Sequence, residues 1–242
     1  MLLFAATVLI CFVNADGARN QAVLDLFQHE YHGDGTYYGN IKEGTCAYGT
    51  DLPPAATNPK IRSLVALNAP QFMGSLVCGL CLRVVGSGHG LGTNPISGEY
   101  IVFTKDLCPV CKAGDVDFAL DGDGRWDIVI QAVQCPVGNT KIQYSFHGSN
   151  QWFVKLQIRN ARIPITEVQL QRNGVWVTPN HNIDGHWLVS DSHEWQAGSI
   201  EIRMTAANGQ TLEDTIPRIE NDVVLNGLKG VQVALDSSLP SV

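Results

Sequence analysis

The sequence predicts a mainly β protein built from two successive domains, a compact barrel followed by a β-sandwich. Three observations predict this arrangement: apolar runs of strand length in the first half, alternating apolar and polar residues in the second, and cysteines that all lie before residue 136. The change in cysteine use indicates two domains that are stabilised in different ways. We place the domains at 33–137 and 138–236, joined by a short linker.

In the first domain, the predicted strands are apolar or rich in β-branched residues, and glycine and proline separate them. They cover 77–85, 99–104 and 127–133, with a glycine-rich loop at 86–98. This loop lies between strands and lacks the strand-then-helix context of a phosphate-binding loop. We interpret the aspartate-rich segment 121–127 as a turn, because it lacks the residue order and the final glutamate of an EF-hand calcium loop.

The second domain shows a clear alternation of apolar and polar residues over 154–159, 167–171 and 200–204. Asn173-Gly174 has the composition of a type I′ turn, and Asn208-Gly209 marks a second hairpin. Several short alternating strands that are joined by tight turns are typical of a β-sandwich of about a hundred residues.

The N-terminal segment predicts export. Leu2–Val13 is almost wholly apolar, and Val13-Asn14-Ala15 fits a small-residue cleavage site, so we interpret 1–15 as a secretory signal peptide. The apolar run is too short to span a bilayer. Residues 16–32 form a weakly specified lead with one helical turn expected within 21–30. We therefore expect a secreted, extracellular protein.

Seven cysteines become six if Cys11 leaves with the signal peptide. An even number in an exported chain predicts three structural disulfides, although the sequence leaves their pairing open. The two Cys-x-x-Cys pairs could instead bind zinc or act in redox chemistry, but export and the lack of a thioredoxin-like pattern favour disulfides. The six are Cys46, Cys78, Cys81, Cys108, Cys111 and Cys135.

The formal net charge of −7 disfavours nucleic acids and anionic membranes as partners. A low content of charged residues with many small polar ones suits a neutral ligand that is rich in hydroxyl groups. The seven histidines are scattered without metal-ligand spacing. We expect no metal, no cofactor and a monomeric protein.

Two carboxylates, Asp106 and Asp117, flank a loop that contains two cysteines, and they lie eleven residues apart. Acidic side chains on a tied loop beside a strand suit acid chemistry or hydrogen bonding to sugars in a cleft. The alternative is a structural turn in which Asp106 accepts hydrogen bonds from backbone amides.

Taken in order, the motifs of the chain resemble those of the expansin family, most closely the expansin-like proteins of microbes. The matching segments are 35–39, 46–49, 66–68, 78–81, 104–109, 116–118, 151–153, 156–160, 174–176, 202–205 and 214–217. The resemblance implies a six-stranded double-psi β-barrel followed by an immunoglobulin-like β-sandwich that binds cellulose. It also implies loosening of plant-type cell wall without sugar hydrolysis, with cellulose and other wall polysaccharides as partners.

The barrel of this family is similar to that of the family 45 endoglucanases, which invert at the anomeric carbon and need both a general acid and a general base. The resemblance assigns the acid to Asp117 and places Asn40 where those enzymes carry the base. An amide cannot take up a proton near neutral pH. We therefore expect a wall-loosening protein and not an enzyme, with Asp34 and Glu43 as nearby carboxylates that could replace the base.

The resemblance also implies a polysaccharide groove lined by Thr36, Tyr38 and Asp106, in which Asp117 is the residue most needed for loosening. Tyr38 departs from the family pattern, because it stands where microbial members carry a second threonine. Cys108 stands where some members carry a groove tyrosine, and we leave it out because a disulfide sulfur cannot donate a hydrogen bond to a sugar.

Trp152 and Phe153 resemble the adjacent aromatic pair of the family's cellulose-binding surface, and Trp187 is the candidate third ring. Flat aromatic rings suit this role because they cover the C–H faces of glucan chains at low entropic cost. Alternation alone would place Trp152 in the core, since it is in phase with Val154. Phe153 is in phase with a polar residue, which allows it to be exposed. We expect Trp176, which follows the hairpin turn, to be part of the core.

Two other function classes remain open. The chain could be a weak β-glucan hydrolase or lytic transglycosylase in which Asp117 or Asp106 acts alone as acid and base. It could also be a carbohydrate-binding or defence protein of the barwin type, although that type usually ends after the barrel.

Overall fold

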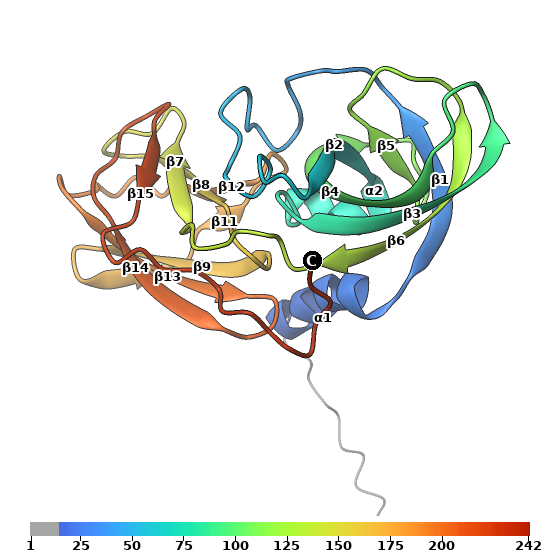
Figure 1. Ribbon diagram of the computed structural model, residues 1–242. Coiled ribbons are helices and arrows are strands. Elements are labelled where there is room, and N and C mark those ends of the chain that lie inside the picture. The colour runs from blue at the N-terminus through green and yellow to red at the C-terminus, as the bar shows by residue number, and fades with distance from the viewer. Residues whose placement is uncertain (1–14) are drawn as a thin grey trace, which may run out of the picture.

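The computed structural model describes residues 15–242 and places a β-barrel beside a β-sandwich, with a helix across their junction (Figure 1). The predicted signal peptide lies outside the described residues, apart from Ala15. Within residues 15–242, no helix is both long and apolar enough to cross a membrane.

The helix α1 spans Ala15–Gln28, so the prediction of a single helical turn is wrong. Val23, Leu26 and Phe27 are spaced as one face of a helix and are at most 4% exposed. They pack against the barrel, where the carbonyl oxygen of Phe27 accepts a hydrogen bond from Gln131 Nε2 at 2.8 Å. On the sandwich side, Arg19 Nη1 donates to the carbonyl oxygen of Thr166 at 3.4 Å. Burial of these three residues against the barrel therefore stabilises the helix, although the many polar residues of the segment give no clear helical pattern in the sequence.

The six strands of the first domain close into a barrel in the order β1-β5-β2-β4-β3-β6, which confirms the predicted barrel. The pairs β1–β5 and β2–β4 are parallel, and the others are antiparallel. The elements are β1 (Tyr31–Tyr37), β2 (Ile61–Asn68), α2 (Ala69–Phe72), the 3-10 turn η1 (Met73–Ser75), β3 (Cys81–Leu91), β4 (Ser97–Cys108), β5 (Val116–Phe118) and β6 (Arg125–Val133).

The barrel strands differ from their predicted bounds in two places. The predicted strand 77–85 begins only at Cys81, because 77–80 is a turn before β3. The predicted loop 86–98 is largely strand, since β3 and β4 continue as a long hairpin. Gly86 permits this pairing, because a β-carbon there would lie 2.4 Å from the carbonyl oxygen of Ile96.

All six predicted cysteines form disulfides, which pair Cys46 with Cys78, Cys81 with Cys135, and Cys108 with Cys111. The first bridge joins the long segment between β1 and β2 to the turn before β3. The second joins the start of β3 to the chain just after β6, and the third closes the loop after β4. Covalent links thus tie the parts of the barrel that have little regular structure of their own.

The second domain is a sandwich of a four-stranded sheet, β10-β9-β13-β14, and a five-stranded sheet, β11-β12-β8-β7-β15. Val154 and Leu156 are fully buried, as their alternation predicts, and both residues of the Asn173-Gly174 turn have the positive φ angles of a type I′ turn. The strands are β7 (Gln143–Phe146), β8 (Val154–Arg159), β9 (Ile165–Arg172), β10 (Val175–Val177), β11 (Asn180–His181), β12 (His186–Val189), β13 (Ile200–Ala206), β14 (Thr211–Ile216) and β15 (Val224–Asn226).

The two domains share a hydrogen-bonded interface. Gln157 and Arg159 point away from the sandwich core, yet they are only 1% and 3% exposed because the segment between β1 and β2 covers them. Gln157 Nε2 donates to the carbonyl oxygen of Cys46 at 2.6 Å, and the Arg159 guanidinium donates to the carbonyl oxygen of Asp51. Asn160 Oδ1 accepts from the amide of Ala55 at 2.8 Å. These contacts hold the barrel and the sandwich in one fixed relation.

Candidate functional site

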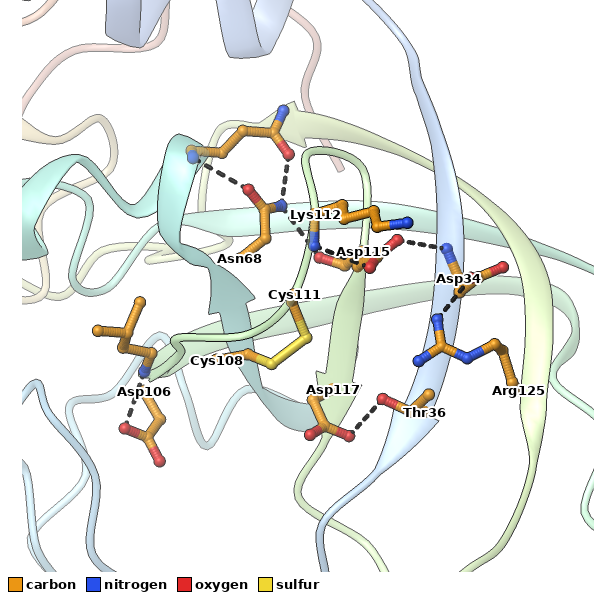
Figure 2. Close-up of a disulfide and its surroundings, with 12 residues drawn as sticks. Asp34, Thr36, Asn68, Asp106, Cys108, Cys111, Lys112, Asp115, Asp117 and Arg125 are labelled. Atoms are coloured by element: carbon orange, nitrogen blue, oxygen red, sulfur yellow. Dashed lines mark hydrogen bonds and ion pairs between the residues drawn. A yellow bond between two sulfur atoms is a disulfide. The ribbon is translucent and has the colours of Figure 1, made fainter.

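The parallel pairing of β1 and β5 places Thr36 directly opposite Asp117. Although the two residues are 81 positions apart in the chain, Thr36 Oγ1 donates a hydrogen bond of 2.7 Å to Asp117 Oδ1 (Figure 2). Both side chains are half-buried and lie on the outside of the barrel wall, since the neighbouring Gly35 and Val116 face its interior. The structure thus brings together two of the predicted groove residues.

Burial is the main cause that raises the pKa of Asp117 above its usual range, and the negative charge of Asp106 raises it further. The hydrogen bond from Thr36 and the positive charge of Arg125 act in the opposite direction. A carboxyl group with a raised pKa keeps its proton to a higher pH than an ordinary carboxyl group, and while protonated it can donate a hydrogen bond as well as accept one.

Asp106 and Tyr38 flank Asp117 on the other side. Asp106 Oδ1 accepts hydrogen bonds from the backbone amides of Thr45 at 2.7 Å and Leu107 at 2.8 Å. The structural interpretation of Asp106 as an acceptor for backbone amides is therefore correct, and its negative charge also raises the pKa of Asp117. Burial raises the pKa of the Tyr38 hydroxyl, and the charges of Asp106 and Asp117 raise it further. The three predicted groove residues Thr36, Tyr38 and Asp106 therefore lie around Asp117.

Lys105 supports this site and was not among the predicted residues. It is 2% exposed, its Nζ lies 5.9 Å from the centre of the Tyr38 ring, and it donates to the carbonyl oxygens of Ile41 and Glu43. Burial lowers the pKa of Lys105 despite the negative charges of Asp106 and Glu43. The signal that could have found it is a lysine inside a strand of buried residues, which needs partners for its charge.

The residues considered as a catalytic base are placed unfavourably for that role. Asn40 is exposed in the segment that follows β1. Asp34 Oδ2 forms an ion pair of 2.6 Å with Arg125 Nη1, which holds its charge on the barrel wall (Figure 2). Glu43 is exposed, and only its backbone oxygen contacts Lys105.

The predicted aromatic surface is only partly present. Trp152 is 47% exposed in the turn before β8, and Phe153 is half-buried beside it. Trp187 is 5% exposed, so its proposed surface position is wrong: register places it opposite the core residue Leu156. Its ring packs edge-on against His181 with 4.8 Å between the ring centres.

Trp176 differs from its predicted core position. It lies half-buried on the edge strand β10, and the Arg203 guanidinium stacks 4.4 Å from the centre of its ring. Edge strands leave one side of their residues uncovered, so alternation alone does not decide burial there.

Comparison with known proteins gives this geometry a family context. No family model matches the chain. It is 25% identical over 141 residues to Expansin-YoaJ of Bacillus subtilis. The matched segment covers 55% of this chain and 60% of that protein. It is 24% identical over 203 residues to Expansin-like protein 1 of Dictyostelium discoideum, which covers 77% of this chain and 66% of that protein. These similarities to two expansins support membership of the expansin family. The matches span less than two thirds of the length of these expansins.

Solved structures agree with the expansin fold. The apo-expansin of Clavibacter michiganensis superposes with a TM-score of 0.68 at 22% identity, over 86% of this chain and 100% of that chain. A variant of the same expansin in complex with cellohexaose superposes with a TM-score of 0.69 at 22% identity over the same shares. The arrangement of barrel and sandwich is therefore that of expansins.

Proposed function

We propose that this protein binds cellulose or a related wall polysaccharide and loosens it without cleaving sugar bonds. The observation that carries this proposal is that Asp117, a half-buried carboxyl group of raised pKa, accepts a hydrogen bond from Thr36, while the position of the expected base is the exposed Asn40. Inverting hydrolysis needs a second carboxylate to activate water. The bound cellohexaose of the structurally similar expansin supports the class of ligand.

The groove would act by replacing hydrogen bonds between glucan chains with hydrogen bonds to protein. Each exchange is worth only about 0.5–1.5 kcal/mol. Several groove contacts must therefore act together, and the result is slippage of polymers and not bond cleavage. Trp152 would hold the protein on the flat face of the polymer, since it is a large exposed ring.

We also infer that the protein acts outside the cell. Its six paired cysteines form bridges that persist in an oxidising compartment. This inference agrees with the apolar N-terminal segment.

The decisive experiment compares the wild type with Asp117→Asn on heat-killed plant wall under constant load. We expect extension to fall at least tenfold in the variant, while binding to cellulose stays within twofold, because the substitution removes the acid without changing the shape of the groove. Asp127→Asn, an exposed aspartate of β6, is the matched control and keeps full extension.

A parallel measurement of reducing ends released from soluble β-glucan separates the rival function. Single-residue hydrolysis or lytic transglycosylation through Asp117 is favoured by its raised pKa, which suits a general acid. Robust product formation that Asp117→Asn abolishes would replace the loosening proposal with that activity. Binding without either extension or product would instead indicate a plain carbohydrate-binding protein.

The sandwich is tested separately by cellulose pull-down. Trp152→Ala should lower the affinity for insoluble cellulose at least tenfold through loss of the exposed ring. Val175→Ala removes a more exposed apolar residue, 65% against 47% for Trp152, from β10 on the other sheet, and should leave binding unchanged.

A further inference from the structure

We propose that a second carbohydrate site lies at one end of the barrel, where a pocket takes the end of a neutral glycan chain. The pocket has a volume of about 360 Å³, within the range of about 300–1,000 Å³ that is usual for sites of small ligands. It opens where β1 and β5 end and β2 begins. Among the residues that line it are Tyr37, Arg62, Asn94, Tyr100, Leu120 and Asp121.

This pocket is separate from the groove around Asp117. The lining residues Tyr37 and Phe118 each come one position after a groove residue, in β1 and β5 respectively. Successive side chains of a strand point to opposite faces of the sheet, so the pocket and the groove lie on different sides of this strand pair. The turn 93–96 between β3 and β4 forms one wall of the pocket. Figure 1 shows this hairpin projecting from the side of the barrel that faces away from the sandwich.

Two aromatic rings of the pocket are held in place by their own hydroxyl groups. Tyr37 Oη donates to the carbonyl oxygen of Asn94 at 2.8 Å, and Tyr100 Oη donates to that of Ser97 at 2.6 Å. Both tyrosines are half-buried, so part of each side chain remains exposed. Aromatic rings that are already immobile cover the C–H faces of a sugar at low entropic cost. The pocket is therefore preorganised for a sugar ring.

Two exposed charged side chains of the pocket can bind sugar hydroxyl groups. Over residues 15–242, neither Arg62 nor Asp121 forms an ion pair or a side-chain hydrogen bond, and the Arg62 guanidinium lies 5.4 Å from the centre of the Tyr100 ring. A guanidinium donates several N–H groups in one plane, whereas a carboxylate accepts through two oxygens. Together they offer the donors and the acceptors that neighbouring hydroxyl groups of a sugar need.

The charges around the pocket favour a neutral ligand. Arg62 would attract a uronate, but Asp121 and Asp123 would repel it, and Asp123 is fixed by the amide of Thr93 at 2.8 Å. An organic cation would suit a pocket lined by aromatic rings, but here the Arg62 guanidinium already stacks on Tyr100 and would repel it. A ligand without charge avoids both penalties.

The position of the pocket favours the end of a chain over its middle. Its walls come from β1, β2, β4, the turn 93–96 and the segment 118–121, which border it on several sides. An open groove lets a polymer pass along it, whereas a hollow at the end of a barrel receives a chain by its terminal units.

The first test locates the site by two-dimensional NMR of the isotope-labelled chain. Titration with cellobiose should shift the backbone amide signals of Thr93, Asn94 and Asp121 together, with the same midpoint concentration. Absence of these shifts at cellobiose concentrations up to the solubility limit would overturn the inference.

The second test compares variants by the same titration. Arg62→Ala and Asp121→Ala change exposed side chains, so the barrel keeps its fold, and each should lower the affinity at least fivefold. Tyr100→Ala should lower it at least tenfold, whereas Tyr100→Phe keeps the ring and should stay within threefold. Arg218→Ala is the matched control, because it removes an exposed arginine from a cavity of about 390 Å³ in the sandwich, and should bind within twofold of wild type. Equal affinity in Arg62→Ala, Tyr100→Ala and wild type would contradict the site.

The third test varies the ligand while the same amide signals are followed. Cellobiose and cellohexaose should bind within threefold of each other, because only the chain end enters the pocket, and digalacturonate should bind at least fivefold more weakly. Affinity that rises tenfold with chain length would assign the binding to an open groove. Tighter binding of digalacturonate would assign it to acidic glycans, and either result overturns the proposal.

The site and the proposed loosening activity can fail separately. Wall extension by a protein whose pocket signals ignore cellobiose would keep the proposed function and remove this site. Cellobiose binding that Arg62→Ala weakens, in a protein that never extends walls, would keep the site and remove the proposed function.

Discussion

The barrel contains all three disulfides of the described chain, whereas the sandwich has none and is closed by tight turns and core packing. The barrel needs covalent ties because long irregular segments, 38–60 and 109–115, carry groove residues and their supports. The sandwich strands alternate clearly and connect through short turns, so hydrophobic burial alone specifies their register. Irregular segments that carry functional residues therefore need a scaffold that fixes them, and in the barrel the disulfides provide it.

The largest expected effect on stability comes from removing the disulfide that closes the longest loop. Cys81→Ser combined with Cys135→Ser opens a bridge of sequence separation 54 and should lower the free energy of unfolding of the barrel by about 4 kcal/mol. Hydrogen exchange followed by mass spectrometry measures this domain by domain. Faster exchange in the sandwich to the same extent would show that the two domains unfold as one unit.

The matching change in the sandwich is Leu156→Ala. Leu156 is fully buried between the sheets, so its truncation leaves a cavity and should cost about 3 kcal/mol. Denaturant titration of this variant should show a lower midpoint with an unchanged slope. Leu212→Ala, at a half-buried position of β14, is the control and should cost clearly less.

The dependence of stability on pH is a further expected difference between the two domains. His186 is 1% exposed, and burial is the main cause that lowers its pKa to about 4, with the charges of Lys155 and His147 lowering it and that of Asp184 raising it. Between pH 6.5 and 4 the unfolded chain binds a proton that the folded chain does not. Stability contributed by neutral His186 is therefore lost as pH falls through this window, by about 1–3 kcal/mol.

Thermal unfolding of His186→Gln should show a flatter dependence on pH over that window than the wild type. An identical slope in both proteins would assign the acid sensitivity to other groups.

The smallest expected effect concerns Asp117. Its pKa is raised, so the folded chain binds the extra proton, and stability falls as pH rises from the unfolded value of about 3.8 through the folded one. Asp117→Asn should therefore raise the melting temperature at pH 7 by at most about 2–4 °C, and the gain should vanish near pH 3. A lower melting temperature at pH 7 would mean that the ionised carboxylate stabilises the barrel.

Much of the fold follows from local sequence. The alternation around Val154 and the Asn173-Gly174 turn predicted β8 and the β9–β10 hairpin, because side-chain direction in a strand has a period of two and only certain residues accept positive φ. The helix α1 was underestimated, because its three buried residues gain their stability from contacts with a barrel that no local pattern describes.

Motifs in the sequence singled out Thr36 and Asp117, which share a hydrogen bond in the structure. They also singled out Trp187, which is buried, and did not point to Lys105. Alternation places a residue on one of two faces but does not say which face another element covers. For the same reason Gln157, in a polar phase of β8, lies buried beneath the barrel.

By itself the sequence determined which residues alternate, where the chain turns and which cysteines are available. Only the tertiary structure decided how the cysteines pair, which rings stay exposed and how Thr36 reaches Asp117. The physical reason is range: turns and alternation are set by neighbours along the chain, whereas pairing and burial depend on strands such as β1 and β5 that meet only after the barrel closes.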